Sequence, residues 1–207
     1  MKFFSIDSPF YKFMMSVGEM MILNFCFLLG CLPLVTIGAA NAAMYTVMRQ
    51  RVLDEGSGTV GPFFRAWWGN LKQGSLFWLV QAFMTVSLGM IFFMTLPTFL
   101  KVIAGILLFL VTVVFSLIYP QLARFRNRWF PYVRNAVILL VLRLKWVLLN
   151  LLVILLPLIL FLLAPVDFLR LGFVWILIGF SLVFYLSAKV MLKVLDPLEE
   201  LAKQHKR

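Results

Sequence analysis

Glu19 is the only acidic residue inside an apolar stretch of this chain. In a membrane helix such a carboxylate can relay protons or bind a substrate, but burying it charged at mid-membrane costs at least ~2.5 kcal/mol. Its position near one end of the stretch favours a solvated carboxylate at the membrane interface over a relay. Asn24 follows in the same stretch, and we expect its amide to hydrogen-bond between helices.

A helix start at Ile37 is the second candidate site. Free backbone N–H groups at Thr36-Ile37-Gly38 could bind an anion or a substrate carboxylate. Reversal of the chain after Pro33 explains the same residues without a ligand, and we prefer that interpretation. Small residues over 38–43 make this helix thin and suited to close contact. The candidate packing or binding residues are Glu19, Asn24, Pro33, Thr36, Gly38, Asn41 and Ala43.

Residue patterns typical of catalysis are missing from the sequence. It contains no Walker-type phosphate loop, no Gly-x-Ser-x-Gly motif and no Cys/His cluster with metal spacing. The sequence therefore predicts a protein that is not an enzyme and that binds no metal and no cofactor. The apolar stretches also contain scattered polar residues that the sequence alone cannot assemble into a pathway: Gln81, Thr85, Thr112, Asn150 and Ser181.

The elements that must position these residues follow from composition. Of 207 residues, 63% are apolar, and several windows of about twenty residues contain no ionisable group. A soluble domain is therefore excluded, and the sequence predicts an all-α integral membrane protein forming one polytopic domain over 1–207. We expect five transmembrane helices at about 14–35, 74–97, 102–121, 146–164 and 169–189.

Amphipathic segments should lie in the membrane surface beside these spans. We expect interfacial helices at about 37–49, 62–73 and 131–145, and a tail helix over 196–207 that begins with Asp196 as its cap. A short motif occurs twice, as Pro62-Phe63-Phe64-Arg65 and as Pro131-Tyr132-Val133-Arg134. The repetition suggests a duplicated helix-hairpin unit, and chance similarity in an apolar sequence is an equally good explanation.

Basic and aromatic residues cluster at the ends of the expected spans. They could imitate an RNA-binding strip, but beside membrane helices anionic lipid headgroups are the simpler partner, so we expect no nucleic acid. The expected lipid-surface contacts are Arg65, Trp67, Trp68, Lys72, Arg124, Arg126, Arg128, Trp129 and Arg134.

The distribution of Lys and Arg predicts the orientation. Segments 36–73, 122–145 and 189–207 carry fifteen of these residues, and the remaining segments carry four. The first group should face the cytoplasm, which gives a cytoplasmic C-terminus and an extracytoplasmic N-terminus. Lys2 and Lys12 fit this arrangement poorly. A re-entrant first stretch that turns back between Pro33 and Gly38 would place them inside instead.

A set of residues between Asn24 and Gln73 carries a resemblance to a known family. The set is Asn24, Leu32-Pro33, Thr36-Ile37-Gly38, Ala43, Phe63-Phe64 and Asn70-Leu71-Lys72-Gln73. It resembles the YesL family of bacterial membrane proteins. This family has no known biochemical function. The resemblance implies a protein of the bacterial plasma membrane, often encoded beside carbohydrate ABC importers. Family members often have Pro after the position of Gly38, whereas this chain has Ala39 and Ala40.

Two functional hypotheses follow. The first is a non-enzymatic accessory subunit that packs against permease subunits of a carbohydrate ABC importer, and it depends mainly on the resemblance. The second is a small carrier, alone or as an oligomer, which requires a polar cavity at mid-membrane.

Overall fold

The computed structural model describes residues 8–56, 58–125 and 129–204 of the chain. Within these ranges every regular element is helical, so the all-α prediction is confirmed. Five segments are long and apolar enough to cross a membrane: Phe10–Cys31, Val60–Phe93, Thr98–Arg124, Leu144–Leu163 and Gly172–Asp196.

The chain reverses direction between the first two helices. Helix α1 (Pro9–Cys31) is followed by the 3-10 turn η1 (Leu34–Thr36) and by α2 (Ile37–Val52). Thr36 is the N-cap residue of α2 by position. The Thr36 hydroxyl lies 2.8 Å from the carbonyl oxygens of both Gly30 and Pro33. It therefore closes the end of α1 and contributes no side-chain bond to the start of α2.

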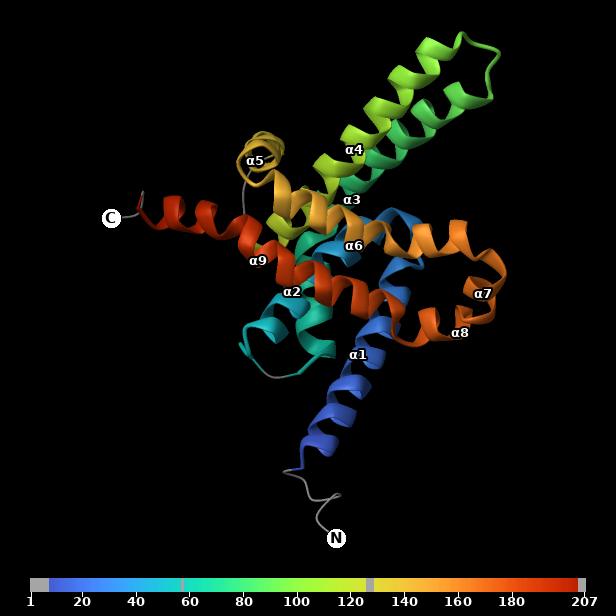
Figure 1. The fold of residues 1–207 in the computed structure, drawn as a ribbon. Helices are drawn as coiled ribbons and strands as arrows, with labels where there is room; N and C mark the ends of the chain where they lie inside the picture. Colours follow the sequence, from blue (N-terminus) through green and yellow to red (C-terminus); the bar gives the residue numbers. More distant parts are fainter. Residues whose placement is uncertain (1–7, 57, 126–128, 205–207) are drawn as a thin grey trace.

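Helix α2 lies in the interior of the molecule, where α1, α3, α4 and α9 pack against it (Figure 1). We expected a surface-lying helix over 37–49, so its position differs from the prediction. Small side chains explain the difference, because they let several helices approach the same backbone closely. Its buried residues are Gly38, Ala39, Ala40, Ala42, Ala43, Met44, Tyr45, Val47 and Met48.

Helix α3 (Val60–Met90) is one continuous helix of 31 residues. The expected boundary between an interfacial helix at 62–73 and a span at 74–97 does not exist. Pro62 lies in the first turn, where its missing N–H is tolerated, and no later proline interrupts the hydrogen bonds. After η2 (Ile91–Phe93), α4 (Thr98–Arg124) returns beside α3, and the two form a projecting hairpin (Figure 1).

The second half of the chain forms another hairpin. The short helix α5 (Trp129–Leu142) buries Tyr132, Ala136 and Leu139, which lie along one of its faces, and α6 (Leu144–Leu163) follows. The turn contains α7 (Pro165–Arg170), α8 (Gly172–Val174) and η3 (Trp175–Gly179), a π-helix, and leads into α9 (Phe180–Gln204).

The C-terminal tail is not a separate helix. Asp196 and Pro197 lie within α9, which continues without a break to Gln204. The sequence signature of a helix start was misleading because α9 already existed at this point, and one proline removes only one backbone hydrogen bond from it. Residues 205–207 of the expected tail lie outside the described residues.

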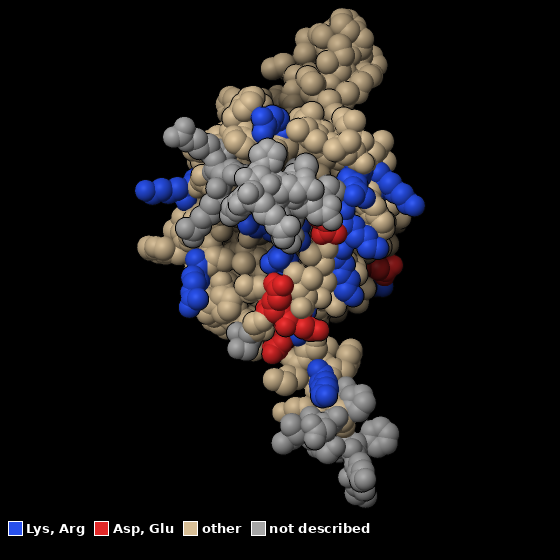
Figure 2. Space-filling view, turned by 90° about the vertical axis from the view of Figure 1, so that its left-hand side faces the viewer, with Lys and Arg blue, Asp and Glu red and all other residues tan. Residues whose placement is uncertain are grey.

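Basic side chains gather at the end of the molecule opposite the two hairpin tips. Figure 2 shows many Lys and Arg side chains on the face at the left of Figure 1. Arg49 from α2 and Arg124 from α4 line one small pocket there, together with Leu192 and Leu195 of α9. The ends of three helices that are distant in sequence therefore meet at a basic face.

Candidate functional site

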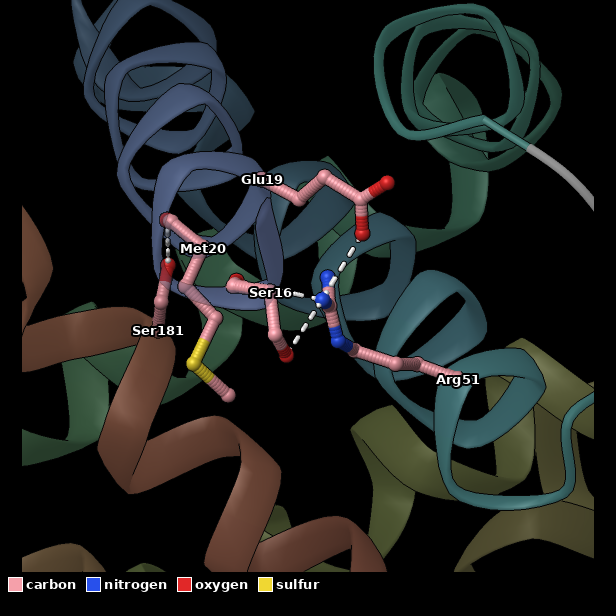
Figure 3. Close-up of polar contacts among 5 residues, drawn as sticks. All are labelled: Ser16, Glu19, Met20, Arg51 and Ser181. Atoms are coloured by element: carbon pink, nitrogen blue, oxygen red, sulfur yellow. Dashed lines mark hydrogen bonds and ion pairs between the residues drawn. The ribbon is translucent and has the colours of Figure 1, made fainter. Parts of the chain in front are cut away.

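Glu19 forms an ion pair between α1 and α2. Its Oε2 lies 2.7 Å from an Nη atom of Arg51 (Figure 3). The same guanidinium donates to the hydroxyl and the carbonyl oxygen of Ser16, at 2.9 and 3.1 Å. Because the Glu19 side chain is 37% exposed, it is a partly solvated carboxylate with a fixed partner. It does not line the cavity described below.

The Asn24 amide joins α1 to the π-helical segment before α9. Its Nδ2 donates to the carbonyl oxygens of Trp175 and Ile176 at 3.3 and 2.6 Å, and its Oδ1 accepts from the Ser181 N–H at 2.9 Å. The Ser181 hydroxyl in turn donates to the Met20 carbonyl oxygen at 2.8 Å (Figure 3). Asn24 is fully buried, and these bonds give its amide the polar partners that a buried amide needs.

The small residues of α2 lie at a close helix crossing. A Cβ atom on Gly38 would overlap the carbonyl oxygen of Gly74 and would lie 2.8 Å from Cβ of Trp78. A Cβ on Gly74 would lie 2.7 Å from the Ala39 nitrogen. Ala43 is completely buried in the same helix. The crossing leaves no space for a ligand, so these residues bring helices together and form no pocket.

A cavity of about 390 Å³ lies between the α3–α4 hairpin and the α6–α9 hairpin, and residues of α1 and α2 also line it. Its size falls in the range of small-molecule sites, roughly 300–1,000 Å³. Aromatic rings of Phe27, Trp78, Phe180 and Phe184 form much of its wall. Its polar lining residues are Asn41, Tyr45, Gln81, Thr112, Ser116, Tyr119 and Ser187.

Hydrogen bonds orient several of these polar groups. The Tyr119 hydroxyl donates to Oε1 of Gln81 at 2.6 Å, which leaves the Gln81 amide N–H groups as donors. Tyr45 and Ser187 share a hydrogen bond of 2.6 Å, and the Ser187 hydroxyl donates to Oδ1 of Asn150. Asn41 makes no side-chain hydrogen bond within the part of the chain that the structure describes. The cavity thus presents both donors and acceptors.

Only some of the predicted residues meet at this cavity. Asn41 lines it, whereas Glu19 and Asn24 lie elsewhere in separate contacts. Gln81 of α3 and Thr112 of α4, which the sequence showed only as scattered polar residues, both line it. Tyr119, Ser116 and Ser187 were missed. In the sequence these residues are distinguished only by a hydroxyl group inside an apolar span. Such hydroxyl groups often bond to a carbonyl oxygen of their own helix, so they do not by themselves indicate a site.

The expected lipid-surface residues take different positions. Trp68 is 73% exposed, and Lys72 and Arg134 are exposed. Trp67 was predicted at the surface, but it is half-buried and its indole N–H lies 3.3 Å from the Gly30 carbonyl oxygen. The ring of Trp129 lies against the ring of Phe77. Arg65 and Arg124 line a second cavity. Arg126 and Arg128 lie outside the described residues.

Among residues 8–56, 58–125 and 129–204, no group of three His, Cys, Asp or Glu side chains is arranged to hold a metal ion. Residues 20–96 match a family model described as "Protein of unknown function, DUF624". No curated protein and no solved structure matches the chain. From Met20 in α1 through α2 and α3, the chain is therefore similar to a family that has no assigned function.

Proposed function

We propose that this protein is a small membrane carrier that binds an uncharged polar solute in the cavity between its two helical hairpins. The observation that carries the proposal is the lining of that cavity. It combines amide and hydroxyl groups with aromatic rings, and no Lys, Arg, Asp or Glu is among its lining residues. A charged solute would have no counter-charge there, and desolvating it inside a membrane would be costly.

The aromatic rings further narrow the class of solute. Trp78, Phe180 and Phe184 provide flat apolar surfaces beside the donors and acceptors of Asn41 and Gln81. Sugars and related polyols combine apolar C–H faces with hydroxyl groups at their edges, so this lining suits them. The proposal is compatible with the resemblance to the YesL family, which implies a carbohydrate context and stays a prediction.

The experiment compares three probes of similar size and different charge. Purified protein in proteoliposomes is tested with radiolabelled glucose, glucuronate and glucosamine. We expect binding or uptake of glucose only. We also expect Gln81→Leu to lose it, because the substitution removes the amide donor that Tyr119 orients. Thr85→Val, on the same helix and outside the cavity lining, is the matched control. Equal binding of all three probes, or full activity of Gln81→Leu, would contradict the proposal.

The membrane topology of the carrier is a further part of the proposal. We propose that α1 and α2 form a re-entrant hairpin that enters and leaves on one side. This is supported by the bonds from Arg51, at the end of α2, to Ser16 and Glu19, in the first half of α1. Both termini then face the cytoplasm, and seventeen of nineteen Lys and Arg residues lie on that side, which leaves Lys101 and Arg170 outside.

Cysteine labelling in intact bacteria tests this topology. Single cysteines replace Lys12, Asp54 and Thr95 in a background where Cys26 and Cys31 are changed to Ser. A membrane-impermeant maleimide should label Thr95→Cys in intact cells, and the other two variants only after permeabilisation. Labelling of Lys12→Cys in intact cells would place the N-terminus outside and would exclude the re-entrant hairpin.

An accessory subunit of a carbohydrate ABC importer is the second candidate. The observation that favours it is the first half of α1, which projects from the bundle (Figure 1) and exposes Phe10, Phe13 and Met14 by 49–63%. A partner helix of a permease could cover this apolar surface. Copurification in mild detergent should yield a permease subunit with the wild-type protein and not with a Phe13→Ser/Met14→Ser variant. Repeated purification without any membrane partner would count against this role.

A further inference from the structure

A second cavity, of about 730 Å³, lies between the α2–α3 pair and the end of α4. Its polar lining residues are Thr46, Gln50, Arg65, Asn70, Gln73 and Arg124. None of them lines the cavity between the two hairpins, so this is a separate site at the basic end of the molecule. Any role for it is independent of the proposed carrier function.

Two guanidinium groups give this cavity a positive charge. Arg65 and Arg124 both line it, and the described lining contains no Asp or Glu. The Arg124 side chain is only 5% exposed, and the carboxylate of Asp196 lies 4.0 Å away and is 55% exposed. Arg49 lines a neighbouring small pocket that shares Arg124 with the cavity. The desolvated Arg124 guanidinium and the nearby Arg65 guanidinium together favour a negatively charged ligand.

The remaining polar groups supply hydrogen-bond donors for such an anion. The Gln50 side chain makes no hydrogen bond within the described residues. The Asn70 amide uses one N–H on the Ala66 carbonyl oxygen at 2.8 Å, and its second N–H stays available. The Tyr132 hydroxyl donates to the Phe125 carbonyl oxygen at 2.6 Å, which reduces the repulsion that this oxygen would exert on an anion. A phosphate, with several acceptor oxygens, matches guanidinium and amide donors.

We propose that this cavity binds a phosphate group. The group could belong to an anionic phospholipid or to a soluble phosphate compound, and the chemistry of recognition is the same for both. The basic face in Figure 2 would attract either source. Leu122 and Phe125 in the wall offer apolar contact next to the guanidinium groups, which suits a lipid headgroup with its attached glycerol.

The experiment uses the full-length protein with two kinds of probe. In the lipid arm, native mass spectrometry measures how much phosphatidylglycerol stays bound after extraction from nanodiscs that contain phosphatidylglycerol and phosphatidylcholine. In the soluble arm, delipidated protein in detergent is titrated with inorganic phosphate and its thermal unfolding is followed. Arg65→Gln removes one guanidinium from the cavity, and Arg134→Gln removes an exposed guanidinium from α5, outside the cavity.

We expect Arg65→Gln to reduce bound phosphatidylglycerol or the affinity for phosphate about tenfold, as for loss of one charge-assisted hydrogen bond. Arg134→Gln should change neither. Because Arg65 is exposed, its substitution should leave the fold intact, which circular dichroism checks. A response in the lipid arm alone identifies a headgroup site, and a response to phosphate identifies a soluble ligand. The proposal is overturned if neither arm responds, or if both variants lose the same amount of bound ligand.

Discussion

Gly38 and Gly74 bring the backbones of α2 and α3 into direct contact. A side chain at either position would meet main-chain atoms of the other helix. A Cβ atom added to Gly74 would lie 2.7 Å from the Ala39 nitrogen, and a Cβ atom added to Gly38 would overlap the Gly74 carbonyl oxygen. Main-chain atoms cannot rotate away as a flexible side chain can. The two helices would have to separate, and the residues around the crossing would separate with them.

Substitutions at this crossing should therefore destabilise the protein. We expect Gly74→Ala to lower the free energy of unfolding by about 1–3 kcal/mol, as in other overpacked interiors. Gly38→Leu should have a larger effect and prevent assembly of a folded protein. Gly69→Ala is the control on the same helix, since a Cβ there meets nothing within 4 Å. Unfolding by titration with a denaturing detergent measures these effects. Equal stability of Gly74→Ala and Gly69→Ala would show that the crossing can relax.

Asn24→Leu should destabilise the junction between α1 and the π-helical segment. The substitution removes three hydrogen bonds and takes away the side-chain acceptor of the buried Ser181 N–H. We expect a loss of about 1–3 kcal/mol. Hydrogen exchange should rise over residues 175–181. Asn70→Leu is the control, because the Asn70 amide bonds to the Ala66 carbonyl oxygen within its own helix; a similar loss there would argue against a special role for Asn24.

Ser187→Ala should disturb the polar wall of the cavity between the two hairpins. The Ser187 hydroxyl connects the Tyr45 hydroxyl to the Asn150 amide, and both would lose a partner in a buried site. We expect a loss of about 1–3 kcal/mol in unfolding free energy. Ser116→Ala should cost less than about 1 kcal/mol, because the Ser116 hydroxyl donates to the Val113 carbonyl oxygen of its own helix. The reverse order of the two variants would contradict this network.

The Glu19–Arg51 ion pair should show measurable coupling in a double-mutant cycle. Glu19→Gln and Arg51→Gln, made singly and together, should give a coupling energy of about 0.5–1 kcal/mol, because the Glu19 carboxylate is partly exposed and screened by water. The coupling should fall at high salt. The pair Asp167–Arg170, with both side chains more than two-thirds exposed, should couple less. Zero coupling at low salt would mean that Ser16 alone fixes Arg51.

Local features of the sequence were sufficient for several parts of the fold. The helix beginning at Ile37 follows from the break at Pro33, and the two hairpin turns near Lys101 and Arg170 follow from the ends of apolar runs. The two misplaced boundaries have a shared cause. Asp196 carries the signature of a helix start, and at Gly74 an amphipathic pattern changes to an apolar one, yet each lies inside a continuous helix. A cap signal acts only where the preceding residues are not helical.

The candidate site was less predictable than the fold. Asn24 was recognised as an interhelical amide, but its partners lie more than 150 residues away in a π-helical segment that no local pattern indicated. Gln81 and Tyr119 come from different helices and are 38 residues apart. The pairing of such groups depends on how the two hairpins pack, and the sequence pattern of each helix carries no information on that geometry.

The sequence by itself determined which segments become apolar helices, because a stretch without charges that is long enough to span hydrocarbon must satisfy its own backbone hydrogen bonds. Only the tertiary structure decided which helix lies inside and where polar groups meet. The position of each helix depends on the close fit of small residues such as Gly38 and Gly74 between neighbouring helices. That fit exists only after the chain has folded, because it involves helix surfaces that are distant in the sequence.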